Sequence, residues 1–135
     1  MATETKQRYI EAVGRRKTAI ARVRITPSTK SSFTVNDKDV KDYFATDELR
    51  AIAQEAFGKS EIGEKFIISV HVLGGGIHSQ AEAVRHGLSR TLITRDENVK
   101  NTLKKLGFLK RDSRQVERKK FGLKKARKAP TWSKR

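Results

Sequence analysis

The residues best placed to do chemistry lie in the short sequence GGGIHS, which runs from Gly74 to Ser79. Between a strand and a helix, such a turn can offer backbone N–H groups and the positive end of a helix dipole to a phosphate. The Walker pattern fails because no Lys-Ser or Lys-Thr pair follows, and the dinucleotide pattern fails because Ser79 occupies its third glycine position. A tight strand-to-helix turn explains the glycines at least as well as a nucleotide site. An RNA phosphate resting on Gly76 to Ser79 would use the same contacts.

Three histidines, His71, His78 and His86, are the other candidates for acid-base chemistry or metal binding. The first belongs to a predicted strand, the second to a loop and the third to a helix, and no cysteine or paired carboxylate completes a ligand set. Ser79, Ser89 and Ser133 likewise lack a base and an orienting partner that the sequence would show. We therefore predict no metal site, no cofactor and no enzyme activity.

The charge of the chain indicates a polyanionic partner. Lys and Arg number 31 against 15 Asp and Glu, a net charge of +16, and such an excess destabilises a compact state unless an anion neutralises it. Residues 111–135 hold 11 of the basic and 2 of the acidic side chains, so they carry +9 and the rest of the chain carries +7. Solvation alone explains so dense a basic segment poorly. Nucleic acid is the expected counter-charge.

The C-terminal tail, residues 109–135, shows no helical periodicity. Phe121 and Leu123 would point well apart on a helix, and Pro130 disfavours one, which argues against an amphipathic helix on a lipid surface. The pattern predicts a segment that is extended or disordered when alone. Such a segment can follow a channel in folded RNA, with Arg side chains on phosphates and with Phe121 and Trp132 stacked on unpaired bases. No recognition helix, zinc finger or basic zipper is present for sequence-specific DNA readout.

Length and composition predict one globular domain with this tail attached. A chain of 135 residues can bury one modest core. It has no cysteine, which fits a reducing compartment, and it shows neither a signal peptide nor an apolar run of membrane-spanning length. We expect a soluble, unexported protein with an N-terminal extension at 1–8, a body at 9–108 and the tail at 109–135, and with no membrane or small-molecule partner.

Alternating residue types predict the strands. In TAIARVRI, residues 18–25, small and apolar side chains fall on one side while Arg22 and Arg24 fall on the other. The preceding run from Tyr9 to Val13 predicts a hairpin with it, and we assign Gly14 to the turn between them. A brief third strand at FTVN ends in Asn36 and Asp37 as turn residues. The sequence KFIISVHVL, residues 65–73, is apolar on both faces and predicts the most buried strand.

Helices are predicted from capping residues and apolar spacing. One runs from Thr46 as N-cap to Gly58 just past its end, with an apolar stripe that requires a sheet to lie on. Ser79 and Glu82 match a capping box at the start of a second helix, and Thr94 with Glu97 repeats the pattern before a third, which Gly107 should end. The expected fold is α/β (α+β): a compact two-layer body in which helices pack on a mixed sheet of about four strands.

Three segments carry a family resemblance. GRRKTAIARV near the start, VLGGGIHSQAEAVRHGLSRTL in the middle and RDSRQVERKKFGLKKARK before the terminal SKR resemble, in this order, the bacterial-type family of protein nine of the small ribosomal subunit. The resemblance extends from about Tyr9 to Arg135. Asp37, Val13 and the loop from Thr26 to Ser32 depart from the usual family pattern, as does the APTW before SKR.

The resemblance implies a structural constituent of the small ribosomal subunit that supports translation. It implies a left-handed crossover in the fold, contrary to the usual handedness, and a body bound to rRNA of the 3′ domain in the head, beside neighbouring head proteins. The tail would thread through rRNA to the anticodon stem of the peptidyl-site tRNA. By position, Arg135 would pair with a tRNA phosphate, Lys134 would assist by charge and Ser133 would help to place them.

The expected location is the ribosome in the cytoplasm, in a bacterial cytosol rather than an organelle. The predicted rRNA-binding residues come from the hairpin, the second strand, the glycine turn with the helix after it, and the tail. They are Arg15, Arg16, Lys17, Arg22, Arg24, Gly75, Gly76, His78, Ser79, Gln80, Arg85, Arg111, Arg114, Arg118, Lys119, Lys120, Lys124, Lys125, Arg127 and Lys128. Two rival functions stay open at this point: a small-molecule phosphotransferase that uses the GGGIHS turn, and a free-standing RNA chaperone.

Overall fold

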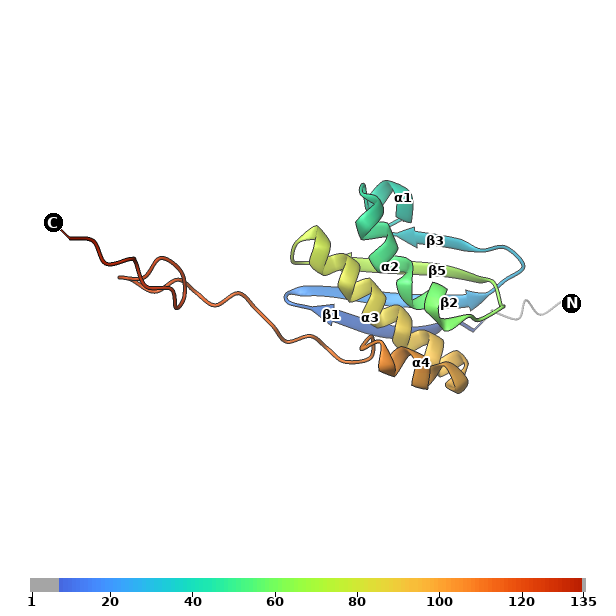
Figure 1. The fold of residues 1–135 in the computed structure, drawn as a ribbon. Coiled ribbons are helices and arrows are strands. Elements are labelled where there is room, and N and C mark those ends of the chain that lie inside the picture. Colours follow the sequence, from blue (N-terminus) through green and yellow to red (C-terminus); the bar gives the residue numbers. More distant parts are fainter. Residues whose placement is uncertain (1–7, 135) are drawn as a thin grey trace, which may run out of the picture.

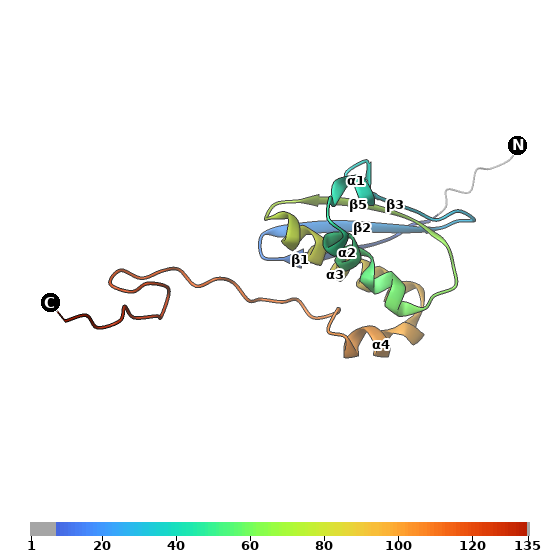
Figure 2. The ribbon, with the colours of Figure 1, turned by 45° about the horizontal axis from the view of Figure 1, so that its top comes forward.

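The structure is a computed structural model that describes residues 8–134. Its elements follow one another as β1 (Ile10–Arg16), β2 (Ala19–Pro27), β3 (Ser32–Val35), β4 (Lys38–Asp39), α1 (Val40–Tyr43), α2 (Asp47–Ser60), β5 (Phe66–Leu73), α3 (Ile77–Arg95), a short 3₁₀ helix η1 (Glu97–Val99) and α4 (Lys100–Lys105). Figures 1 and 2 show one layer of strands with α2, α3 and α4 on one side of it. The predicted two-layer body is confirmed.

The five strands form a single mixed sheet in the order β1-β2-β5-β3-β4. Strands β3 and β5 run parallel, and the other neighbours run antiparallel. The sequence predicted about four strands, and the fifth is the two-residue β4. Between β3 and β4, Asn36 and Asp37 have positive φ angles of 50° and 66°, as a tight hairpin turn requires. The Asn36 amide also donates to the Val72 carbonyl and accepts from the Val72 N–H, both at 2.9 Å, which ties the turn to β5.

The parallel pair β3 and β5 is joined by a crossover through α1 and α2. In Figure 1 the helices lie in front of the sheet, both strands point to the left, and β5 lies below β3. This is the left-handed sense that the family resemblance implied, against a strong general preference for the right-handed one. The crossover places α2 beside α3, so both helices cover the same face of the sheet.

The core lies between that face and the helices. The alternation in β2 is confirmed, because Ala19, Ala21, Val23 and Ile25 are fully buried while Arg22 on the opposite face is exposed. The register sets this buried row against a second one on β5, which consists of Ile68, Val70 and Val72. The apolar sides of α2 and α3 cover both rows. The buried helix residues include Ala53 and Ala56 of α2 and Val84, Leu88 and Leu92 of α3.

The sequence KFIISVHVL was predicted to form the most buried strand, and β5 lies at the centre of the sheet, but only one of its two apolar faces is covered. Ile67 is 40% exposed and Leu73 is 67% exposed, because none of the helices in residues 8–134 covers the outer face of the sheet. Residues 65–73 are apolar on both sides of the strand, but the position of the helices decides which side loses contact with water.

Helix ends differ from the predictions in three places. Thr46 caps α2 as predicted, since its Oγ1 accepts from the Leu49 N–H at 3.4 Å, but the helix continues past Gly58 and ends at Glu61 with φ 54°. Ser79 is not a cap. Helix α3 begins earlier, at Ile77, its N-cap is Gly76, and Ser79 lies buried inside the first turn.

The third predicted cap is also displaced. Thr94 lies within α3, where its hydroxyl donates to the Arg90 carbonyl at 3.0 Å. Asp96 caps the following η1 instead, because its Oδ1 accepts from the Asn98 N–H at 3.0 Å. Gly107 with φ 79° ends α4 as predicted. Beyond α4 the described residues form no helix or strand, and Figure 1 shows the tail running away from the body.

Candidate nucleic-acid interface

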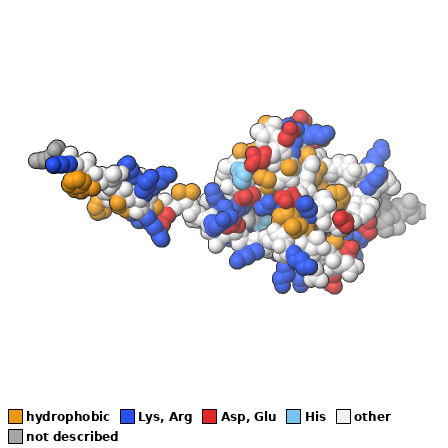
Figure 3. Space-filling model, viewed as in Figure 1, with side chains coloured by type: hydrophobic (Ala, Val, Ile, Leu, Met, Phe, Trp, Pro, Cys, Tyr) orange, Lys and Arg blue, Asp and Glu red, His pale blue; other side chains and the backbone are white. Residues whose placement is uncertain are grey.

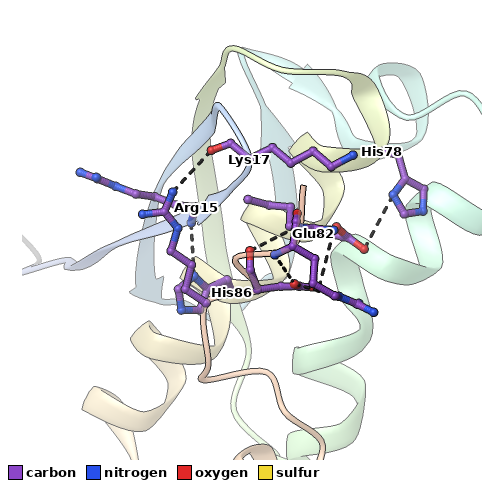
Figure 4. Close-up of polar contacts among 9 residues, drawn as sticks. Arg15, Lys17, His78, Glu82 and His86 are labelled. Carbon is purple, nitrogen blue, oxygen red and sulfur yellow. Dashed lines mark hydrogen bonds and ion pairs between the residues drawn. The ribbon is translucent and has the colours of Figure 1, made fainter. Parts of the chain in front are cut away.

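One end of the body brings together the β1–β2 hairpin, the first half of α3 and the first residues of the tail (Figure 4). We call residues 109–114 the root and residues 115–134 the outer tail. Lys17, with φ 53°, makes the hairpin turn, and Arg15 and Arg16 precede it at the end of β1. Figure 3 shows Lys and Arg side chains gathered at this end and along the outer tail.

Two glycines bring α3 close enough to β1 to build this end. Gly14 was predicted to lie in the turn, but it lies in β1. A Cβ at this position would overlap the Ala83 carbonyl oxygen and the Gly87 nitrogen. A Cβ on Gly87 would lie 2.8 Å from a methyl group of Val23 and 3.0 Å from the Gly14 nitrogen. The backbones of β1 and α3 are therefore in direct contact, and only glycine at these two positions permits so short a distance between them.

Arg16 points into this junction rather than into solvent. Its side chain is 12% exposed, and its Nε lies 2.6 Å from Oε2 of Glu82 on α3. Nη1 donates to the backbone carbonyls of Asp112 at 3.2 Å and Arg114 at 2.7 Å, and Nη2 lies 3.6 Å from the Asp112 carboxylate. The five-donor fork of arginine suits such a set of oxygens.

His86 makes the second link at this end. The Arg15 backbone N–H donates to Nδ1 at 3.2 Å, so Nδ1 carries no proton and Nε2 donates to the Leu109 carbonyl at 3.2 Å. The ring is therefore neutral. Burial lowers the pKa of His86, and the nearby positive charges of Arg90 and Arg111 lower it further. Protonation of Nδ1 would place its N–H against the Arg15 N–H, and the hydrogen bond between them would be lost.

We expect the stability of the body to fall in mild acid because of His86. The unfolded chain takes up a proton at about pH 6.5, whereas the folded chain resists until a lower pH, since the folded-state pKa is depressed. The contribution of neutral His86 to the free energy of unfolding is therefore fully present above about pH 6.5 and is lost as the pH falls below that value. Urea unfolding at pH 7.5 and 5.5 measures this decline, and His86→Gln should show less of it. An equal decline in both proteins would contradict the expectation.

The glycine turn packs against the hairpin and the side chain of Gln80. Gly74 and Gly75 take φ angles of 80° and 64°, and side chains there would press against Thr18 and Ala19 of the hairpin. The side chain of Gln80 donates back to the Gly74 carbonyl at 3.1 Å and accepts from the Tyr43 hydroxyl at 2.6 Å. These contacts favour the turn over a phosphotransferase site.

Other predicted RNA contacts near this turn also have partners within the chain. His78 lies 3.7 Å from Glu82, and Ser79 is buried. Arg85 pairs with Glu55 at 3.1 Å, and its guanidinium lies 4.9 Å from the centroid of the Phe108 ring. Gly76 caps α3, and nothing would lie within 4 Å of a Cβ there.

The outer face of the sheet carries Arg22 and Arg24. Both approach Glu11 on the neighbouring strand, at 3.8 Å and 3.1 Å, and the Arg24 guanidinium lies 4.5 Å above the Tyr9 ring. Such solvent-exposed pairs are weak. A phosphate can therefore compete with Glu11 for either arginine.

The outer tail presents its cations to solvent. Glu117 is its single acidic residue, and it lies 3.0 Å from Arg127 and 3.5 Å from Lys120. Among the described residues, no ion pair is formed by Arg118, Lys119, Lys124, Lys125, Lys128 or Lys134. Phe121 is 100% exposed and Trp132 is 82% exposed, so both rings are accessible for stacking. Ser133 and Lys134 are exposed as well, and Arg135 lies outside the described residues.

Sequence reasoning missed the acidic and aromatic partners that organise this end. Glu82 was assigned to a cap, His86 only to an unlikely metal site, and Asp112 and Phe108 to no site. The spacing of Glu82, His86 and Arg90 at i, i+4 and i+8 does place them on one face of a helix. That signal cannot reveal the root as their neighbour, because the pairing spans up to 98 residues of sequence.

Residues 8–134 contain no group of three His, Cys, Asp or Glu side chains arranged to hold a metal ion. None of the helices in that range combines the length and the hydropathy needed to span a membrane.

The chain resembles one known protein family over most of its length. The family model described as ribosomal protein S9/S16 matches residues 14–135, from the buried glycine of β1 to the last residue of the tail. The chain belongs to this family. It is therefore a ribosomal protein of the small subunit, an RNA-binding component of a ribonucleoprotein that acts in translation. The family is of a structural, non-enzymatic type, and its place is the ribosome.

Proposed function

We propose that the body binds rRNA of the 3′ domain in the head of the small subunit, beside neighbouring head proteins, and that the tail reaches the anticodon stem of the peptidyl-site tRNA. The observation that carries this proposal is that the most basic segment of the chain is the one without secondary structure. Residues 111–135 carry +9 without forming a helix or strand among the described residues. A segment of this kind gains its shape from the polyanion that it binds.

The body contributes a second basic surface. The hairpin tip with Arg15 and Lys17 lies at the end from which the tail leaves (Figure 4), and Arg22 and Arg24 of β2 add basic side chains on the outer face of the sheet. rRNA that spans this end would contact the body and the tail together. Contacts to phosphates would supply affinity through counterion release, and Phe121 and Trp132 would stack on unpaired bases. The ribosome is that of a bacterial cytosol in this proposal.

The terminal residues Ser133, Lys134 and Arg135 are assigned to tRNA. Lys134→Gln combined with Arg135→Gln is expected to weaken peptidyl-site tRNA binding by about tenfold or more, because charge-assisted hydrogen bonds contribute about 1.5–3 kcal/mol each. Filter binding of tRNA to reconstituted small subunits measures the change. A matched control, Lys124→Gln with Lys125→Gln, removes the same charge further from the terminus and should leave tRNA affinity close to that of the native protein.

Assembly distinguishes this proposal from a free-standing RNA chaperone. The protein should sediment with small subunits in high salt, and its C-terminus should crosslink to tRNA. Both double variants, at Lys134 with Arg135 and at Lys124 with Lys125, should still assemble into small subunits. Unchanged tRNA affinity in the Lys134 and Arg135 variant would contradict the tRNA contact, whereas failure to sediment with subunits, together with similar affinity for unrelated RNAs, would favour the chaperone.

A further inference from the structure

The root is in contact with the body before any RNA is present. Gly107 reverses the chain after α4, and its N–H donates to the Lys104 carbonyl at 3.1 Å while that of Phe108 donates to the Leu103 carbonyl at 3.2 Å. Phe108 is then 7% exposed. The chain therefore enters the root from a buried anchor.

Two side chains of the body hold the backbone of the root. His86 of α3 donates to the Leu109 carbonyl, and Arg16 of β1 donates to the carbonyls of Asp112 and Arg114. All three acceptors are main-chain atoms, so the contacts fix the path of the root. Figure 4 shows His86 and Glu82 on α3 beside Arg15 of the hairpin.

The charges around the two side chains support the same geometry. Glu82 pairs with the Arg16 guanidinium, while the Asp112 carboxylate accepts hydrogen bonds from Nε and Nη2 of Arg114 at 3.0 Å and 2.7 Å. These hydrogen bonds from Arg114 hold the pKa of Asp112 well below its usual range, so the carboxylate is charged at neutral pH. The charged groups that face the ring of His86 or line the small cavity beside it are Arg15, Arg16, Glu82, Arg85, Arg90, Lys110, Arg111 and Asp112.

We propose that Arg16 and His86 form a clamp that holds residues 109–114 against the body in the RNA-free protein and so fixes the direction in which the outer tail leaves. Arg16 then acts as a positioning residue and not as a phosphate ligand. RNA binding has to order only the outer tail, because the root is already in place, and this lowers the entropic cost of association. The inference concerns the chain before it meets RNA and holds whether or not the tail reaches tRNA.

Distances between two spin labels test the clamp in the full chain. The chain has no cysteine, so Lys59→Cys on α2 and Ser113→Cys in the root, both at exposed positions, give two unique labelling sites. Double electron–electron resonance should show one narrow distance peak in this background at pH 7.5. Arg16→Gln should abolish the narrow peak and leave a broad distribution, because the root loses its two carbonyl contacts and its ion pair.

Arg15→Gln is the matched control. This substitution lies one residue from Arg16 and removes the same charge. It keeps the backbone N–H of residue 15, which donates a hydrogen bond to His86, so the narrow peak should persist. Thermal unfolding followed by circular dichroism reports whether the body of each variant stays folded. If Arg16→Gln does not fold, Arg16→Lys retains a charge for Glu82 but cannot reach all the carbonyl and carboxylate oxygens together. It should fold and still broaden the distribution.

The His86 half of the clamp has its own readout. Lowering the pH from 7.5 to 5.5 should broaden the distribution in the labelled parent but change it less in His86→Gln, whose side chain does not titrate. A distribution in the parent as broad as that of Arg16→Gln would overturn the proposal. So would narrow peaks in both Arg16 variants, or a parent distribution that is unaffected by pH and by substitution of His86.

Discussion

Gly14→Ala should lower the free energy of unfolding by about 3 kcal/mol or more, the upper part of the range for an overpacked site. The new methyl group would meet the Ala83 carbonyl oxygen and the Gly87 nitrogen. Both are backbone atoms of α3, so no side-chain rotation relieves the overlap. Either α3 moves away from β1, which opens the core beneath it, or β1 separates from the sheet. Urea denaturation of the purified protein measures the loss, with the transition midpoint and slope fitted separately.

The same substitution at Gly58 provides the control. Gly58 lies inside α2, and nothing lies within 4 Å of the place that a Cβ would occupy. Alanine is the better helix former by about 1 kcal/mol, so Gly58→Ala should stabilise the protein slightly. Opposite signs for one methyl group would show that backbone contact, and not the loss of glycine as such, decides the outcome. If Gly14→Ala unfolds at the same urea concentration as the native chain, α3 does not lie on β1 as the structure has it.

Removal of residues 115–135 should remove most of the salt dependence of RNA binding and leave only the part that the basic surface of the body contributes. The segment holds nine basic side chains and one acidic one, and each phosphate contact adds roughly 0.7–0.9 to the slope of log K against log salt. The deletion should therefore reduce the slope by as much as roughly 6–8. Among the described residues, the ion pairs of the outer tail are internal to it, so the body should keep its core. Titration of a 3′-domain rRNA fragment at several salt concentrations measures the slope.

A second variant separates stacking from charge. Phe121→Ala with Trp132→Ala retains every cation, so the salt slope should stay the same while the affinity falls by about 1–3 kcal/mol for each lost stacking contact. Both rings are exposed in the RNA-free structure, so their removal should not affect folding. An unchanged slope after deletion of residues 115–135 would place the RNA contacts on the body instead and would overturn the role proposed for the tail.

Several elements of the fold could be predicted because their signals are local. The alternation in β2 identified its buried row, Thr46 identified the start of α2, and Asn36 with Asp37 identified a hairpin turn. The absence of periodicity in the tail likewise predicted that it forms no helix. Each of these depends on the residue types within about one turn or one strand. The family resemblance added the handedness of the crossover, which no residue pattern in the chain indicates.

The errors occur where a residue's role depends on a distant segment. Gly14 was assigned to the turn because its partner Gly87 is 73 positions away. The apolar residues on both faces of β5 did not reveal that only the side that meets the helices is covered. Ser79 and Glu82 match a capping pattern, but α3 begins two residues before Ser79.

By itself the sequence determined that the chain is a basic α/β protein with a non-helical tail, because charge density and periodicity are properties of neighbouring residues. Only the tertiary structure decided which arginines face inward. The register of β1 and the close approach of α3 bring Arg16 to Glu82 and to the root, whereas Arg15, on the alternate side of the same strand, remains exposed. A strand reverses its side chains at every residue, so two adjacent arginines of equal charge take different roles once a helix covers one face.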